Sequence, residues 1–336
     1  MTSSSAATPA LNPGRTTTLV VRPGQRQARR RRLLVIFGML APALLGLAIF
    51  FVYPLIASIF YSFTSFNLLS DPTWVGLRNY QYLFTEDPNV GIAALNTLWF
   101  VVIMVPVKLA FAFAIAGLLA RARRSNGVWR TLYYLPALVP PVASVVAFVF
   151  LFNPGTGPVN LILGWLGVHP GPLWFNDANL AKPSLLILAV WVMGDVMIIF
   201  LAGLLDVPRE LYEASSLDGA NGVQKLIYVT LPAMVPVLVF SLVTGVIAAL
   251  QYFTEASVAS ATASGQATVG GGGALVAGYP DQSLLTYTQW LYERGFSDFQ
   301  LGYASALAVL LFVVASLCLI FLLRKVKAFM PEESSL

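Results

Sequence analysis

Six long apolar stretches alternate with shorter, more polar segments along the 336-residue chain. They cover residues 33–60, 93–119, 131–152, 184–205, 232–253 and 302–323. Each holds about 20 or more residues, the length with which an α-helix crosses roughly 30 Å of hydrocarbon. The stretches lack the alternation of barrel strands, and only helices or closed barrels satisfy their backbone groups inside lipid. The pattern therefore predicts an all-α, polytopic membrane protein with six transmembrane helices.

Prolines and glycines modify this pattern in two places. The third stretch opens with YYLPALVPPVAS, in which Pro136, Pro140 and Pro141 are expected to kink or interrupt the helix. The longest polar segment, about 254–301, contains ATASGQATVGGGG, which has the composition of a flexible linker. It also contains LLTYTQWLYERGF (284–296), which predicts a short helix at the outer membrane surface.

Composition supports a membrane protein and excludes several kinds of site. Hydrophobic residues make up 57% and charged residues 10% of the chain, whereas soluble domains carry about a quarter charged residues. The single Cys318 and single His169 exclude an internal disulfide framework and a histidine-based metal cluster. The Gly270–Gly273 run is not a phosphate-binding loop, because no Gly-Lys pair occurs in the sequence. We therefore expect no bound cofactor, no metal and no nucleotide hydrolysis by this chain.

The basic residues predict the orientation in the membrane. Of the 20 Lys and Arg residues, 16 fall on one side of the predicted spans and three on the other. The positive-inside rule then places both termini in the cytoplasm. The run Arg29–Arg32 is interpreted as an orientation signal that contacts anionic lipid and not nucleic acid. The apolar run that follows it is longer than the core of a signal peptide, which favours an uncleaved first helix.

These observations give a predicted organisation. Residues 1–28 form a disordered basic cytoplasmic tail, 29–325 a six-helix membrane domain, and 326–336 a second cytoplasmic tail. Within the membrane domain, residues of about 206–231 form a polar cytoplasmic elbow between the fourth and fifth spans. The segment of about 254–301 forms a long outer loop.

The elbow has the local chemistry of a helix, a turn and a second helix. Asp206 can cap a helix whose early turn contains Pro208. Asp218-Gly219 is a turn signal, because glycine accepts positive φ angles. A second short helix is expected through Gln224 to Tyr228. A helix across the mouth of two spans could transmit a push as a rigid-body tilt of both, although periodicity alone is equally consistent with an ordinary surface loop.

Five ordered motifs give the chain a family resemblance. EASSLDGANG at 213–222, followed by Leu-Pro at 231–232, resembles the EAA loop of ABC importer permeases, most closely the carbohydrate-importing branch. WVGLRNY, LFNPGTGPVN, FLAGLLDVPRELYEASSLDGA and GFSDFQLGYASALAVLL are similar to further motifs of that branch, in the same order. Two departures are present: Ser215 replaces the usual second alanine, and the outer segment 257–280 is longer and lacks a clear GGP signature.

The resemblance implies the fold of a type I importer transmembrane domain and an elbow that seats in a cleft on a cytoplasmic ATPase subunit. It implies that Glu213 hydrogen-bonds at this docking surface, Ala214 packs closely and Gly219 makes the turn. ATP and Mg²⁺ would be bound by the partner ATPase and not by this chain. The residues assigned to ATPase coupling are Glu213, Ala214, Ser215, Asp218, Gly219, Ala220, Leu231 and Pro232.

Two spans carry an ionisable residue each, and such residues at membrane depth are expected to be functional. Lys108 and Asp195 lie at similar depths on the second and fourth spans. Three interpretations remain open: an ion pair between helices, lining of a substrate cavity, or separate accommodation with Lys108 extending towards the cytoplasm.

A substrate pathway for sugars would require hydroxyl-directed hydrogen bonds and aromatic faces. The residues that could supply them, together with Lys108 and Asp195, are Trp191 on the fourth span and Gln251, Tyr252, Phe253, Thr254 and Glu255 at the end of the fifth. Equally, Trp191, Tyr252 and Phe253 could be aromatic residues of the membrane interface.

The sequence thus predicts one permease subunit of an ATP-driven sugar importer. The resemblance implies as partners a second homologous permease, two ATPase copies and an extracytoplasmic solute-binding protein. The alternatives are a non-sugar solute, such as glycerol phosphate or a polyamine, and a secondary transporter. A secondary transporter would need inverted repeats, which are not found in the sequence.

Overall fold

The computed structural model describes residues 23–121, 126–265 and 277–327. The chain divides into two compact units, Met1–Ala57 and Ser58–Leu336. The described part of the first unit is helical throughout. It contains α1 (Pro23–Leu47), a π-helical turn (Ala48–Val52) and the beginning of α2 (Tyr53–Tyr61).

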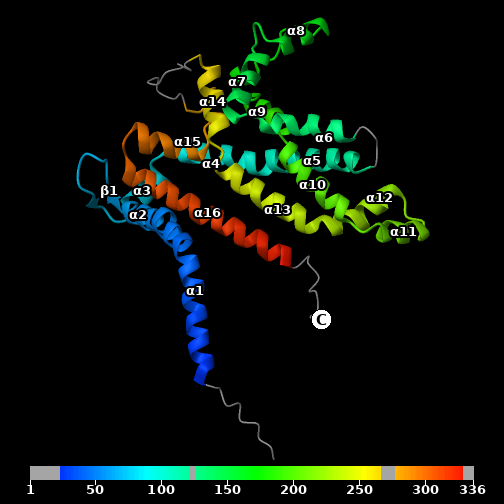
Figure 1. Cartoon of the computed structure of the whole chain (residues 1–336). Helices are drawn as coiled ribbons and strands as arrows, with labels where there is room; N and C mark the ends of the chain where they lie inside the picture. Colours follow the sequence, from blue (N-terminus) through cyan, green and yellow to red (C-terminus); the bar gives the residue numbers. More distant parts are fainter. Residues whose placement is uncertain (1–22, 122–125, 266–276, 328–336) are drawn as a thin grey trace, which may run out of the picture. The chain divides into compact units, whose positions relative to one another are not determined.

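The second unit is a helical assembly with one two-stranded antiparallel sheet in its described part (Figure 1). The sheet pairs β1 (Thr64–Ser65) with β2 (Thr73–Trp74). The α-helices are α3 (Arg78–Thr85), α4 (Pro88–Trp99), α5 (Val105–Ala120), α6 (Asn126–Tyr134), α7 (Pro141–Leu151), α8 (Pro158–Trp165), α9 (Ala181–Trp191), α10 (Gly194–Asp206), α11 (Arg209–Leu217), α12 (Gly222–Lys225), α13 (Leu231–Leu250), α14 (Thr254–Ala263), α15 (Tyr287–Tyr292) and α16 (Leu301–Lys327). Short 3₁₀ or π segments are Phe100–Met104, Leu135–Leu138, Trp174–Asn176, Leu226–Thr230 and Glu293–Ser297.

Four continuous helical segments of the described residues are long and apolar enough to cross a membrane, and two bent pairs bring the number to six if each pair is one span. The continuous segments are Val35–Tyr61, Pro88–Ala120, Gly222–Leu250 and Leu301–Arg324. The bent pairs are Gly127–Leu138 with Pro141–Leu151, and Ala181–Trp191 with Gly194–Asp206. The six predicted apolar stretches correspond to these segments.

The third span is interrupted where its prolines predict. The axis turns by 97° between the two helical pieces, and α7 starts at Pro141. The fourth span is also broken, by 47°, although it has no proline at the break. Gly194 begins the second piece, and a Cβ at this position would lie 2.4 Å from the Tyr133 carbonyl oxygen. The bend of the fourth span therefore lies against the backbone of the first piece of the third span.

Small side chains allow the inner helices to pack closely. Ala112 and Ala116 of α5 are fully buried against α10, where Met197 and Phe200 are also fully buried. Small residues at such crossings bring helices together in membranes, where dispersion contacts and not water exclusion drive association. Next to this cluster, α13 lies beside α16 (Figure 1).

The described part of the segment after the fifth span contains two helices. Helix α14 begins at Thr254 and packs against α7. The predicted short helix is present as α15, and its Tyr287, Gln289 and Trp290 side chains are buried against the rest of the protein. The Gly270–Gly273 run lies outside the described residues.

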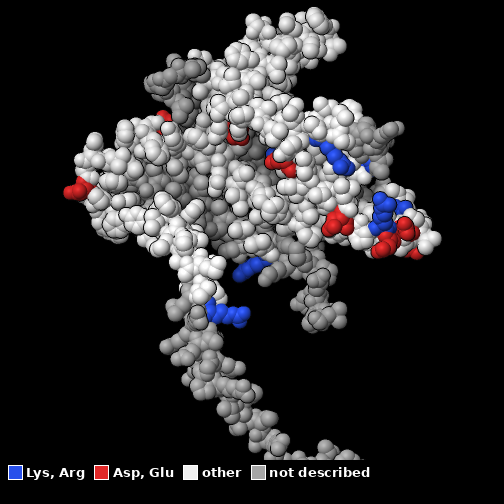
Figure 2. All heavy atoms as spheres, in the orientation of Figure 1, with Lys and Arg blue, Asp and Glu red and all other residues white. Residues whose placement is uncertain are grey.

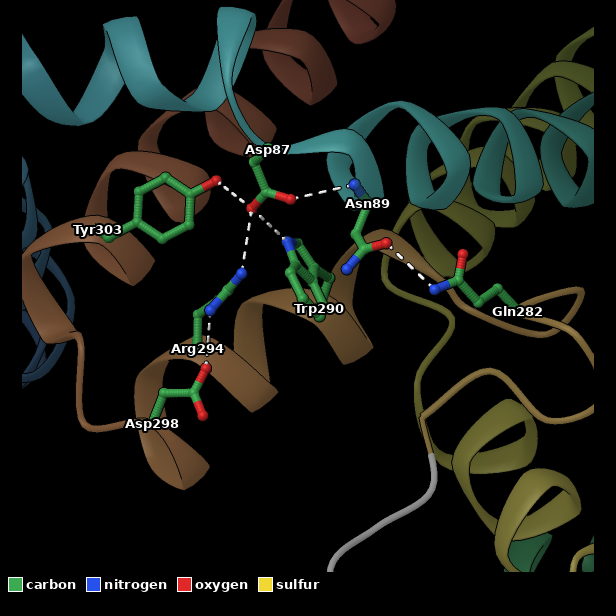
Figure 3. Close-up of polar contacts among 7 residues, drawn as sticks. All are labelled: Asp87, Asn89, Gln282, Trp290, Arg294, Asp298 and Tyr303. Atoms are coloured by element: carbon green, nitrogen blue, oxygen red, sulfur yellow. Dashed lines mark hydrogen bonds and ion pairs between the residues drawn. The ribbon is translucent and has the colours of Figure 1, made fainter.

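A buried carboxylate joins three elements that are distant in the sequence (Figure 3). Asp87 caps α4 by accepting a hydrogen bond from the Asn89 backbone N–H at 3.0 Å. Its Oδ2 accepts hydrogen bonds from Trp290 Nε1 at 2.9 Å and from the Tyr303 hydroxyl at 2.7 Å. The Arg294 guanidinium lies 3.8 Å from the same oxygen. Together these contacts connect α4, α15 and α16.

The WVGLRNY motif builds a neighbouring junction. The Asn79 side-chain amide donates hydrogen bonds to the backbone carbonyls of Ser62 at 2.8 Å and Thr64 at 2.9 Å. The Tyr80 hydroxyl donates to the Ser62 hydroxyl at 2.8 Å. On the other side, the Gly302 backbone N–H donates to the Phe66 carbonyl at 3.0 Å. The motif therefore holds the chain after α2, and Phe66 of that chain segment contacts the start of α16.

Candidate functional site

The elbow is a helix, a turn and the start of a long helix. Helix α10 continues through Asp206, and Pro208 occupies the N-cap position of α11. The prediction that Asp206 caps the next helix is therefore wrong, because α10 extends through that residue. The predicted second short helix is likewise the first part of one continuous helix from Gly222 to Leu250.

The predicted turn at Asp218-Gly219 is confirmed. Gly219 has φ +78°, the left-handed conformation that glycine adopts without steric cost. The Ala220 N–H donates to the Ser215 carbonyl at 3.0 Å, which closes α11. After the turn, Asn221 and Gln224 form a capping box, each accepting a hydrogen bond from the other's backbone N–H.

Side-chain hydrogen bonds fasten α11 to the long helix. The Tyr212 and Thr230 hydroxyls lie 3.0 Å apart, and Lys225 Nζ donates to the Ser216 hydroxyl at 2.6 Å. These contacts hold α11 against the start of the helix Gly222–Leu250. A force on α11 is therefore passed to that helix.

Most of the residues predicted to couple to an ATPase are exposed in the elbow. Of the residues predicted to couple to an ATPase, Glu213, Ala214, Asp218, Gly219 and Pro232 are exposed, and Ser215, Ala220 and Leu231 are half-buried. Leu217 is 90% exposed at the end of α11. Figure 2 shows charged side chains gathered at this end of the molecule, over α11 and α12.

A cavity of about 500 Å³ lies among the broken spans and the end of α13. It brings together seven of the eight predicted pathway residues: Lys108, Asp195, Gln251, Tyr252, Phe253, Thr254 and Glu255. Trp191 is not among the lining residues, and its ring packs 5.2 Å from that of Phe148, centroid to centroid. The volume falls within the roughly 300–1,000 Å³ of small-molecule sites.

Lys108 and Asp195 both pair and line the cavity. Lys108 Nζ lies 3.5 Å from Asp195 Oδ1. Asp195 stands in the first turn of α10, directly after the break of the fourth span, where the helix dipole favours a negative charge. The ion pair is therefore present and both residues lie in the cavity wall, whereas separate accommodation of Lys108 does not match the structure.

Two serines of the cavity were not singled out from the sequence. Ser144 on α7 and Ser241 on α13 line the cavity and are each 2% exposed. Neither hydroxyl has a hydrogen-bond partner among the described residues. Single serines in apolar spans are common, so only the three-dimensional arrangement distinguishes these two.

Burial raises the pKa of the Glu255 carboxyl, and the charge of Lys108 partly opposes this effect. A carboxyl with a raised folded-state pKa destabilises the folded protein above that pKa, where it must carry a buried charge. We therefore expect Glu255→Gln to unfold at a higher temperature than the wild type at about pH 8. The difference should shrink as the pH falls below the unfolded-state pKa of about 4.3, where the carboxyl becomes protonated in both states. Thermal unfolding of the purified protein in detergent measures it, and an equal melting temperature of the two proteins at about pH 8 would contradict it.

Apolar helices around a partly polar cavity, with a solvent-exposed elbow between two of them, define a membrane transport component. The chain belongs to the family of binding-protein-dependent transport system inner membrane components, whose sequence model matches residues 109–329. It is accordingly a multi-pass permease of the ABC importer class, and this family consists of membrane subunits and not of enzymes.

Relatives cover most of the chain. The probable ABC transporter permease protein YesP of Bacillus subtilis strain 168 is 36% identical over 299 residues, covering 89% of this chain and 92% of the relative. The arabinooligosaccharides transport system permease protein AraP of the same organism is 31% identical over 280 residues, covering 82% of each. The sulfoquinovosyl glycerol transport system permease protein SmoG of Agrobacterium fabrum is 31% identical over 290 residues, covering 85% of this chain and 88% of the relative.

Solved structures share the fold. The crystal structure of a bacterial ABC transporter involved in the import of the acidic polysaccharide alginate matches with a TM-score of 0.76 at 20% identity. The match covers 91% of this chain and 100% of that chain. The predicted fold, a type I importer transmembrane domain, is therefore confirmed.

Proposed function

We propose that this chain is one of two permease subunits of an ATP-driven importer for a sugar or oligosaccharide. One observation carries the proposal: α10 connects the cavity to the elbow. Asp195 in its first turn lines the cavity, and its last residue, Asp206, is followed after two residues by α11. A displacement of α11 must therefore act on a helix that carries part of the cavity wall.

The elbow is the proposed docking site for an ATPase subunit. Its exposed carboxylate Glu213 and small Ala214 face outward from α11, and the Gly219 turn fixes the direction of that helix. In this assembly two ATPase copies bind ATP and Mg²⁺, so this chain carries no cofactor. The elbow and both termini lie in the cytoplasm, in line with the basic residues of these segments.

The shapes of the fourth and fifth spans determine which helices a displacement of the elbow would move. The helix Gly222–Leu250 is continuous and can tilt as one body, moving Gln251 and the residues after it at the cavity. The fourth span is bent at Gly194, so α10 can swing against α9 without moving the whole span. ATP-driven closure of the ATPase pair would thus reshape the cavity through α10 and the long helix, a rigid-body switch with a hinge.

The substrate class rests on the relatives and the cavity. AraP and SmoG are named for an arabinooligosaccharide and a sulfoquinovosyl glycerol, both of which contain a sugar. The cavity offers the amide of Gln251, the hydroxyl of Thr254 and aromatic rings at Tyr252 and Phe253, groups that suit a pyranose. An extracytoplasmic binding protein would deliver this sugar to the permease pair.

Reconstitution tests the proposal. Proteoliposomes holding this chain, a second permease and the ATPase subunits should accumulate labelled oligosaccharide when ATP and the binding protein are supplied. Omission of the ATPase should reduce uptake to background. Uptake that needs no ATPase and follows an ion gradient would identify a secondary transporter instead. Selective uptake of glycerol phosphate or a polyamine would point to the non-sugar alternative.

A further inference from the structure

We propose that the cavity binds an uncharged sugar unit and that Ser144 and Ser241 hydrogen-bond its hydroxyl groups. The inference rests on the proposed function and deepens it, because it assigns the charge class of the substrate and two binding residues.

The two serines differ from other buried hydroxyl residues of the bundle. A serine or threonine inside a helix commonly donates to the carbonyl one turn earlier. Ser184 of α9, which is 1% exposed, donates in this way to the Leu180 carbonyl at 2.8 Å. Thr97 of α4, which is 4% exposed, donates to the Ala93 carbonyl at 2.8 Å. Ser144 and Ser241 have no such bond among the described residues, although they are equally buried.

An unpaired buried hydroxyl costs the folded protein free energy, because water no longer satisfies it. A sugar hydroxyl both donates and accepts, so it can satisfy a serine from within the cavity. Ser144 belongs to the outer piece of the broken third span and Ser241 to the long helix after the elbow. Both line the same 500 Å³ cavity, and the ligand would therefore bridge two elements that the proposed motion displaces.

The charges of the cavity oppose an acidic ligand. Its lining contains one cationic side chain, Lys108, and two carboxyl groups, Asp195 and Glu255. Lys108 lies 3.5 Å from Asp195, and its charge also acts on Glu255. No lining cation is therefore left to balance a uronate, sulfonate or phosphate. A charge that leaves water must be paired, so this surface favours a neutral ligand.

Equilibrium dialysis tests the inference on the purified complex of both permeases and the ATPase, with the binding protein omitted so that the cavity alone selects. The ligands are labelled maltotriose, cellotriose and trigalacturonate. We expect saturable binding of at least one uncharged trisaccharide and weaker binding of trigalacturonate. The variant carrying both Asp195→Asn and Glu255→Gln, which frees Lys108, should bind trigalacturonate more tightly than the wild type does.

The serine variants test the hydroxyl contacts. Ser144→Ala and Ser241→Ala should each weaken binding of the uncharged trisaccharide about 5-fold, the worth of one hydrogen bond. Their melting temperatures should stay equal or rise, because each change removes an unpaired polar group. Ser184→Ala is the matched control: it removes a paired buried hydroxyl and should leave ligand affinity unchanged.

The outcomes separate this inference from the proposed function. Three results would overturn the inference alone. The wild type could bind trigalacturonate more tightly than the uncharged trisaccharides, or both serine variants could bind with wild-type affinity. A complex that imports sugar could also bind none of the trisaccharides. A reconstituted complex that hydrolyses ATP without importing any sugar would contradict the proposed function.

Discussion

Replacing Gly219 with valine is expected to abolish ATP-driven uptake while the protein remains inserted in the membrane. Gly219 has φ +78°, which costs a β-branched residue about 1–2 kcal/mol or more. A Cβ at this position would meet no atom within 4 Å, so the effect comes from backbone strain and not from a clash. The strain would redirect α11 away from the surface on which an ATPase docks.

Glu213→Ala should give the same loss of uptake for a different reason. The Glu213 side chain is exposed and makes no hydrogen bond or ion pair within the described residues. Its removal therefore leaves the fold intact, and a loss of uptake would report a contact with the partner. Uptake into whole cells, normalised to the amount of protein in the membrane, measures both effects.

Two matched variants control for changes in the elbow itself. Gly222→Ala alters a glycine of the same elbow that lies in a helix with an ordinary φ angle and has no atom near its Cβ position. Glu210→Ala removes an exposed carboxylate from the first turn of the same helix. Both should retain uptake. Normal uptake by Gly219→Val together with Glu213→Ala would show that the elbow does not couple to ATP hydrolysis.

The sequence predicted those features that depend on local signals. Apolar length defined the spans, the prolines at 136, 140 and 141 marked the bend of the third span, and Asp218-Gly219 marked the turn. Each of these follows from steric or solvation rules that act within a few residues. Five of the seven predicted pathway residues in the cavity meet there for a similar reason, since Gln251–Glu255 are consecutive and adjoin the end of one span.

Features that depend on distant contacts could not be predicted. The bend of the fourth span has no proline, and the close approach of Gly194 to the Tyr133 carbonyl oxygen is a tertiary contact. Trp191 resembled a pathway residue by depth and chemistry, but its ring packs against Phe148. Asp87 is followed by proline and has the local pattern of an N-cap, whereas its partners Trp290 and Tyr303 lie 203 and 216 residues further along the chain.

Asp87 is where we expect the largest loss of stability. Its side chain is fully buried and accepts hydrogen bonds from Trp290 and Tyr303, and its removal leaves the Arg294 guanidinium without its buried partner. Breaking a buried, hydrogen-bonded charge cluster costs about 3–5 kcal/mol. Asp87→Ala should therefore lower the melting temperature of the purified protein strongly and release α4 from α15 and α16.

A second carboxylate on the same arginine provides the comparison for this prediction. Arg294 Nη1 also donates to Asp298 at 3.0 Å, but the Asp298 side chain is 37% exposed. Solvent weakens such a pair to about 0.3–0.5 kcal/mol, so Asp298→Ala should barely change the melting temperature. Combining Asp87→Ala with Tyr303→Phe should cost less than the sum of the two single changes, because both remove the same hydrogen bond. If Asp87→Ala and Asp298→Ala are equally mild, the buried carboxylate does not hold these three helices together.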